Sequence, residues 1–254
     1  MTVRSAETSP VVYARVAGLL YLAIIIFGIF SEVFVRSSLI VKGDAGATAA
    51  NIVASEGLFR IGFAADAIML MSDVAIAVIL YVLLKPVSKT LSLTAAVFRL
   101  TQAAVLGYNL LNYYAALLLL NGAHYTAVFS NDQRNTLAML FLEMHSHGYD
   151  LGLLFFALSN VFLGYLVVKS DYFPGILGYG LIAAAAVYLT GSLSRFLFPD
   201  YLPFIEPAYI VPFAAELSFC LWLLVKGVRR EVTVIAAGAF FSRSGAFKRG
   251  RAAW

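Results

Sequence analysis

The sequence predicts an all-α fold: a polytopic membrane helix bundle with about six transmembrane helices. Hydrophobic residues make up 61% of the 254 residues and charged residues only 13%. Soluble domains have about 45–50% apolar and about 25% charged residues, so this composition is typical of a membrane protein. Apolar windows long enough to cross a bilayer recur between turn signals. Six spans with short connections occupy most of the chain, which leaves no room for a second domain.

Turn residues set the bounds of these helices. Lys85-Pro86 ends the second span, Asn121-Gly122 ends the third, and Phe173-Pro174-Gly175 precedes the fifth, because proline is favoured at the start of a helix and Asn-Gly in a turn. We expect helices at about 11–35, 57–84, 90–120, 135–168, 174–197 and 206–228.

Three segments need a separate interpretation. A basic start followed by Val16–Phe30 is also typical of a signal peptide, but the run lacks a small-residue cleavage site and is interpreted as an uncleaved first helix. Residues 36–56 are expected to form a longer loop with a short interfacial helix. The fourth span is longer than a bilayer requires, so it either tilts or begins outside the membrane.

The distribution of lysine and arginine predicts the orientation. With the amino terminus inside, the inner segments carry more cations than the outer ones, to which Arg36 and Arg195 are assigned, so both termini are expected to be cytoplasmic. The predicted domains are a cytoplasmic tail at 1–10, the transmembrane domain at 11–228, and a basic tail at 229–254 that is disordered or lies on the membrane surface. The expected location is the inner (plasma) membrane, as a multi-pass protein.

The expected partners follow from the same charges. The bilayer surrounds the spans, and the basic tail favours anionic lipid headgroups over nucleic acid, which is not expected as a partner. The single cysteine, Cys220, excludes an internal disulfide. The oligomeric state is left open. The chain contains neither a glycine-rich phosphate loop nor a G-x-S-x-G motif, so no catalytic residue is predicted.

Ionisable and polar residues inside the spans are the candidate functional residues, because a charge at the centre of a span costs about 2.5–3.5 kcal/mol. Helical spacing places Asp66 and Asp73, seven residues apart, on one face. The third span has a polar stripe of its own that includes Arg99. The candidate pocket residues are Glu32, Asp66, Asp73, Arg99, Asn109, Asn112, Asp150 and Glu216.

The acids outnumber the buried cations, which predicts an outward-facing acidic pocket that binds a metal or another cation. Arg99 is the expected partner of Asp73 or of Glu216.

A metal site is the leading interpretation. Glu143, His147 and Asp150 stand at i, i+4 and i+7 on the fourth span, a spacing used by metal-binding bundles, and a divalent metal such as Zn is the possible cofactor. His145 lies about 200° round the helix from His147, so the two histidines cannot both point at one site.

Four other hypotheses remain open. The polar residues could form only a hydrogen-bond and ion-pair network that fixes the helix register. A bound metal with an open position would give a membrane-embedded hydrolase of lipid-like substrates. A small transporter or proton-coupled sensor would use the titrating acids. A structural membrane subunit would use the apolar surface and the basic tail.

Four sequence runs carry a resemblance. A-R-V-A-G-L-L-Y-L at 14–22, F-R-I-G-F-A-A-D at 59–66, F-P-G-I-L-G at 173–178 and E-L-S-F-C-L-W-L-L-V-K-G at 216–227 resemble the bacterial membrane family known as domain of unknown function 4386. The resemblance covers roughly residues 13–228. It implies a multi-span inner-membrane protein and no particular activity. The basic tail after Arg230 lies beyond it.

Overall fold

The computed structural model describes residues 9–122 and 126–229. Helices dominate these residues, and none of them forms a strand. Six helical segments are long and apolar enough to cross a membrane, which confirms the all-α membrane bundle. The predicted carboxy-terminal tail lies outside the described residues except for Arg229, and so does most of the amino-terminal tail.

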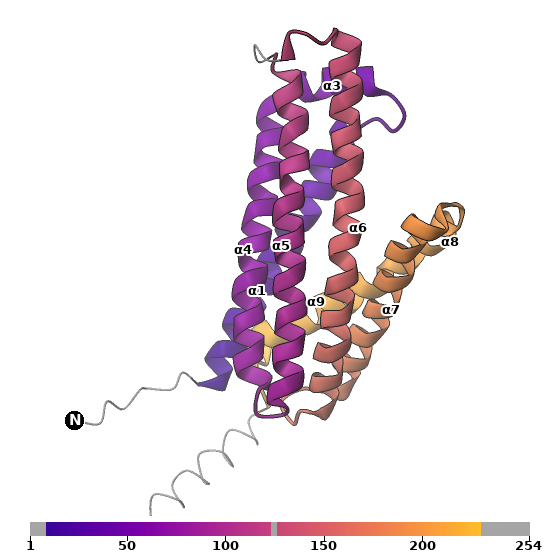
Figure 1. Cartoon of the computed structure of the whole chain (residues 1–254). Helices are drawn as coiled ribbons and strands as arrows, with labels where there is room; N and C mark the ends of the chain where they lie inside the picture. Colours follow the sequence, from indigo (N-terminus) through magenta and orange to yellow (C-terminus); the bar gives the residue numbers. More distant parts are fainter. Residues whose placement is uncertain (1–8, 123–125, 230–254) are drawn as a thin grey trace, which may run out of the picture.

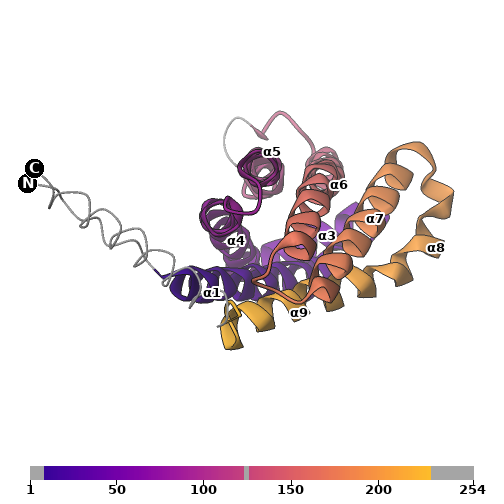
Figure 2. The ribbon, with the colours of Figure 1, turned by 90° about the horizontal axis from the view of Figure 1, so that it is seen from below.

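Six long helices form a closed ring that Figure 2 shows end-on. Each helix packs against the next along the chain, and the last returns to the first. The ring therefore has an interior to which every helix can contribute side chains. Its members are α1 (Pro10–Ile29), α4 (Glu56–Leu84), α5 (Lys89–Leu120), α6 (Asn131–Lys169), α7 (Gly175–Leu197) and α9 (Ile210–Val225).

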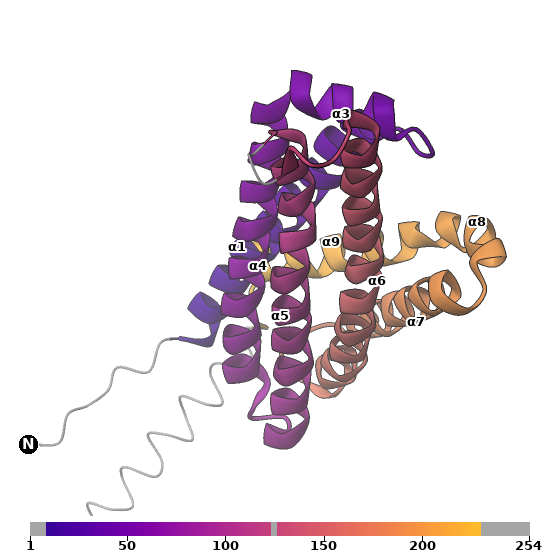
Figure 3. The ribbon, with the colours of Figure 1, turned by 45° about the horizontal axis from the view of Figure 1, so that its top comes forward.

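Short elements join the ring helices. A π-helical segment, η1 (Phe30–Arg36), continues α1 into α2 (Ser37–Leu39). The short helix α3 (Ala45–Ala54) contacts α4, α5 and α6 at the end of the bundle opposite the described chain ends (Figures 1 and 3). The short helix predicted in the 36–56 loop is thus present. Between α7 and α9 the chain makes three short turns, η3 (Pro199–Tyr201), α8 (Leu202–Ile205) and η4 (Glu206–Tyr209).

The observed helix bounds follow the predicted ones closely, with differences in three spans. The first span continues beyond the predicted residue 35, through η1 and α2 to Leu39. The fourth span begins at Asn131, because Ser130 and Gln133 form a reciprocal capping box that satisfies the first free N–H groups. The regular helix of the sixth span begins only at Ile210, since prolines at 199, 203 and 207 break the preceding residues into short turns.

Both described chain ends lie at the same end of the ring. The β-carbon position of Gly227 lies 3.5 Å from Cγ1 of Val11, and the backbone N–H of Arg229 donates to the carbonyl of Tyr172 at 3.1 Å. An even number of crossings requires this arrangement. The assignment of this end to the cytoplasm stays a prediction from the charge distribution.

Glycines let α6 approach both of its neighbours closely. A β-carbon on Gly164 would lie 2.6 Å from the carbonyl oxygen of Gly178 on α7, and one on Gly152 would lie 2.6 Å from Leu106 on α5. Beyond the Gly164–Gly178 crossing, α7 and α9 lean away from the upper part of α6 (Figures 1 and 3). The ring is therefore tight at the end where the described residues begin and finish, and wider towards its other end.

Candidate functional site

Three buried aspartates in the described part of the spans are each paired with an arginine, and the best shielded pair is Asp73–Arg99. The arginine Nε donates to Asp73 Oδ1 at 2.8 Å, and its Nη2 lies 2.6 Å from the same oxygen. Gln102 donates to the other carboxylate oxygen at 3.1 Å. The arginine expected to pair with Asp73 or Glu216 is thus bonded to Asp73, across α4 and α5.

Aromatic rings enclose the guanidinium of Arg99. Its central carbon lies 5.3 Å from the ring centre of Tyr21 and 4.9 Å from that of Phe156, within the range of a cation–π contact. The residue is only 1% exposed. Because an arginine cannot be deprotonated in a protein, this charge is permanent and must keep its carboxylate partner.

The second group of ion pairs is centred on Arg36, in the π-helical segment η1. It donates to Glu32 at 2.7 Å and to Asp66 on α4 at 2.6 Å. The side chain of Glu32 is 65% exposed, whereas that of Asp66 is 5% exposed. Asp66 is therefore neutralised by a residue of the first span and does not share a site with Asp73.

Arg195 forms the third group, between α6 and α7. Its Nε lies 3.0 Å from Asp150 Oδ2, its Nη2 donates to the Ser146 hydroxyl at 2.6 Å, and the Ser192 hydroxyl donates to Asp150 Oδ1 at 3.4 Å. The side chain of Arg195 is 28% exposed. This pair is consequently the least shielded of the three.

Glu216 on α9 differs from these carboxylates. It accepts a hydrogen bond from the amide of Asn160 at 3.4 Å and one from the Tyr188 hydroxyl. Within the described ranges, no lysine, arginine or histidine nitrogen lies within 4.0 Å of its carboxylate. The residue is only 9% exposed. Glu216 is therefore a buried acid whose hydrogen-bond partners are neutral.

A cavity of about 200 Å³, called the central cavity below, lies inside the ring. All six long helices contribute to its walls. Its polar wall contains both Asp73 and Glu216, together with Gln102 and Tyr188, and much of the remainder is aromatic or aliphatic. The carboxylate with a permanent partner and the one without therefore face the same space.

One buried oxygen in this wall has no hydrogen-bond donor. Gln102 is 3% exposed, and its Oε1 has no partner among the described residues. The orientation of this amide is fixed, because a carboxylate can only accept and the NH₂ group must therefore face Asp73. A buried acceptor without a donor costs free energy, which a bound donor would recover.

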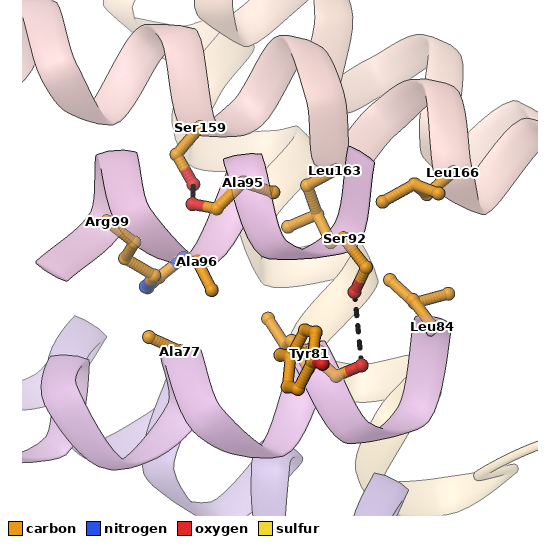
Figure 4. Close-up of a pocket in the computed structure, with 11 residues that line it drawn as sticks. Ala77, Tyr81, Leu84, Ser92, Ala95, Ala96, Arg99, Ser159, Leu163 and Leu166 are labelled. Carbon is orange, nitrogen blue, oxygen red and sulfur yellow. Dashed lines mark hydrogen bonds between the residues drawn. The ribbon is translucent and has the colours of Figure 1, made fainter. Parts of the chain in front are cut away.

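A second, much smaller cavity lies on α4, α5 and α6 beside Arg99 (Figure 4). Its volume is about 10 Å³, which is close to the least space that one water molecule needs. The Ser92 and Ser159 hydroxyls in its wall already donate to the carbonyls of Tyr81 and Ala95. This niche has no room for a larger ligand, so the central cavity is the candidate site.

The predicted metal ligands are not brought together. Within residues 9–122 and 126–229, no three His, Cys, Asp or Glu side chains are close enough to hold a metal. Glu143 is exposed, Asp150 is bonded to Arg195, and the Nδ1 of His147 lies 2.8 Å from the backbone carbonyl of Glu143. The i, i+4 and i+7 spacing is present, but neighbouring groups occupy two of the three side chains.

The helical phase separates the two histidines as predicted, but with the opposite assignment. His145 is the buried one, at 5% exposure, and its ring lies 5.4 Å from that of Tyr113. Asn109 donates to its backbone carbonyl at 2.7 Å, and Asn112 donates to Asn109. These asparagines therefore join α5 to α6 and do not line the central cavity.

The structure thus divides the predicted pocket residues. Asp73 and Glu216 line the central cavity and Arg99 contacts Asp73, whereas the other members belong to separate contacts. Sequence reasoning missed Tyr188, Asn160 and the cavity aromatics, which ordinary membrane helices also contain. It also did not pair Arg36 or Arg195 with an acid, although Arg36 stands four residues after Glu32, a spacing at which an ion pair can form along one helix.

Comparisons with known proteins identify a family but no activity. The family described as "Domain of unknown function (DUF4386)" matches residues 16–227. An uncharacterized protein of Archaeoglobus fulgidus is 32% identical over 160 residues, which cover 63% of this chain and 80% of that protein. No solved structure matches the chain significantly.

Proposed function

The chain belongs to the DUF4386 family, and we propose that it is a membrane protein that binds a monovalent organic ammonium ion in the central cavity. The observation that carries this proposal is Glu216: a buried carboxylate in a cavity wall, with neutral hydrogen-bond partners and no ion pair among the described residues. Burial of an unpaired charge is costly, so a cation that enters the cavity gains from it.

The charge balance favours a single positive charge. Asp73 and Glu216 contribute two negative charges to the wall, and Arg99 contributes one positive charge beside it. With both carboxylates ionised, the surplus is one negative charge, which a monovalent cation neutralises. A divalent metal would also need several protein ligands, and the described residues contain no cluster of three.

The other walls suit an organic cation with N–H groups. An ammonium has three donors, which match the Glu216 carboxylate and the free Oε1 of Gln102. Phe156, Tyr188 and Phe213 supply ring faces in the same cavity, and aromatic faces attract cations. A cavity of about 150 Å³ in another protein holds benzene, so about 200 Å³ has room for one ring with a short aminoalkyl group.

The test compares three probes of the same shape and different charge: benzylammonium, benzyl alcohol and benzoate. Wild-type protein in zwitterionic lipid nanodiscs at neutral pH is expected to bind benzylammonium best and benzoate least. Glu216→Gln should remove this preference, because it keeps the shape and removes the charge. Glu143→Gln is the matched control, since it removes an exposed carboxylate outside the cavity.

Binding can be followed by thermal unfolding, because a ligand that binds only the folded protein raises the unfolding midpoint. Cys220 is the single cysteine and is buried, so its reaction with a thiol-reactive dye reports unfolding. The proposal fails if wild type shows no preference for benzylammonium over benzyl alcohol. It also fails if Glu216→Gln keeps that preference.

A further inference from the structure

We infer that the central cavity opens sideways into the hydrocarbon layer, between α1 and α9, and that its ligand is an amphipathic alkylammonium whose apolar tail stays in the bilayer. This inference rests on the proposed function and adds the class of ligand and its route. It depends on which cavity residues reach the surface of the bundle, and on the nature of the surface around them.

Two residues of the cavity wall are partly exposed at the surface of the bundle. Ile29 on α1 is 38% exposed and Phe213 on α9 is 45% exposed. Glu216 lies three residues beyond Phe213, nearly one turn further along α9, and is buried. The path from the surface to the unpaired carboxylate therefore runs past Phe213, over a distance of about one helical turn, roughly 5 Å.

The packing of α1 against α9 explains why an opening lies at this level. Near the chain ends the two helices are in close contact: a β-carbon on Gly18 would lie 2.8 Å from the backbone nitrogen of Leu224. The rings of Tyr21 and Phe219 pack edge to face with centroids 6.1 Å apart. Beyond this contact α9 crosses α1 at an angle (Figures 1 and 3). Ile29 is the last residue of α1 and Phe213 lies near the start of α9, so both are distant along their helices from this contact.

The surface around this opening is mainly apolar, although the side chain of Glu32, three residues beyond Ile29, is 65% exposed and pairs with Arg36. Ile26 and Val33 on the first span and Ile210 on α9 are 53%, 54% and 65% exposed. All three belong to segments long and apolar enough to span the membrane, and exposed apolar side chains at that depth face lipid tails. A ligand that crosses this rim must tolerate hydrocarbon, which an alkyl chain does and a small hydrated ion does not.

The size of the cavity limits how much of a ligand it can hold. About 200 Å³ accommodates a head group and a short apolar portion, but not a long chain. A long-chain amine can place its ammonium at Glu216 only if its tail leaves through an opening, and the opening at Ile29 and Phe213 leads to lipid. The site therefore suits a single-chain cationic amphiphile that enters from the bilayer.

The test uses dodecylammonium and benzylammonium in zwitterionic nanodiscs, with binding measured by equilibrium dialysis. Partition into the lipid is subtracted with Glu216→Gln nanodiscs of the same composition, so that only binding that depends on Glu216 is counted. Wild type is expected to bind both amines. Ile29→Trp narrows the opening and should weaken dodecylammonium binding about tenfold, because the larger ring takes up space that the alkyl chain needs.

Leu19→Trp is the matched control. It introduces a tryptophan into an exposed position of α1 that belongs neither to the cavity wall nor to the rim of the opening, and it should leave binding unchanged. Benzylammonium, which fits wholly inside, should still bind Ile29→Trp at equilibrium. Phe213→Trp narrows the opening from α9 and should act in the same direction as Ile29→Trp.

The outcomes separate the two proposals. If wild type binds benzylammonium but not dodecylammonium, the cavity is not open to lipid and only the inference fails. The inference also fails if Ile29→Trp and Phe213→Trp both leave dodecylammonium binding intact. If wild type does not bind benzylammonium at all, the proposed function itself fails.

Discussion

Asp73 and Glu216 face the same cavity from two helices that both pack against α1, and their surroundings differ in one respect. Asp73 on α4 is held by Arg99 and Gln102, whereas Glu216 on α9 has only the neutral partners Asn160 and Tyr188. Two buried carboxylates of one site thus have different partners. The ion pair of Asp73 joins α4 to α5, and under the proposed function the carboxylate of Glu216 meets the ligand.

The arrangement of the helices agrees with this division. Asp73 lies on the tightly packed side of the ring, where α4 and α5 are held together by the ion pair itself. Glu216 lies on α9, which leans away from the bundle beside the opening at Phe213. A ligand site needs access from outside the bundle. Glu216, which has no arginine partner among the described residues, is therefore better placed to meet a ligand than Asp73 is.

The largest effect is expected from Arg99→Met. Removal of one partner of a buried ion pair leaves an uncompensated charge, which costs about 3–5 kcal/mol of unfolding free energy. Cys220 should therefore react with a thiol-reactive dye at a clearly lower temperature than in wild type. Arg99→Met combined with Asp73→Asn should recover much of the loss, because no unpaired charge remains.

Arg60→Met is the matched control for this prediction. It removes an arginine from the exposed pair with Glu56, and the unfolding midpoint should hardly change because solvent screens such pairs. If Arg99→Met unfolded at the wild-type temperature, Asp73 would not be the structural member of the two acids. The comparison with Glu216 would then lose its basis.

The sequence predicts the helices well because their limits depend on local signals. Proline, glycine and capping residues act within a few positions, so Lys85-Pro86 and Phe173-Pro174-Gly175 mark their boundaries without any tertiary information. Burial of Arg99 against a carboxylate is also predictable, since a permanent charge inside a membrane requires a partner.

The partners of the other acids were not predictable from spacing within one helix. Arg36 and Arg195 look like segment-end cations in the sequence, yet they neutralise Asp66 on α4 and Asp150 on α6. Which helices are neighbours, and at which height, depends on close contacts such as Gly164–Gly178 and on the tilt of α7 and α9. Helical periodicity gives no information on neighbours or on height, and for this reason Glu143, His147 and Asp150 looked like a plausible set of metal ligands.

Arg195→Met should have an intermediate effect. The pair with Asp150 is partly accessible to solvent, since the side chains of Arg195 and Asp150 are 28% and 11% exposed. The free energy of unfolding should therefore fall by about 1–2 kcal/mol, between the values for exposed and buried pairs. The midpoint measured at Cys220 should lie between those of wild type and Arg99→Met. A loss equal to that of Arg99→Met would mean that shielding does not set the difference between these acids.

The smallest change in stability is expected from Glu216→Gln without ligand. Glutamine keeps the shape of glutamate and can still accept from Asn160, while the unpaired buried charge is removed, so the unfolding midpoint should stay the same or rise slightly. Asp73→Asn is the matched comparison: the same chemical change in the same cavity, but one that leaves Arg99 without its counter-charge and should lower the midpoint. If Glu216→Gln lowered the midpoint as much as Asp73→Asn, Glu216 would be a second structural acid. Its carboxylate would then have a stabilising partner in the folded protein, and a ligand cation would not be needed to balance it.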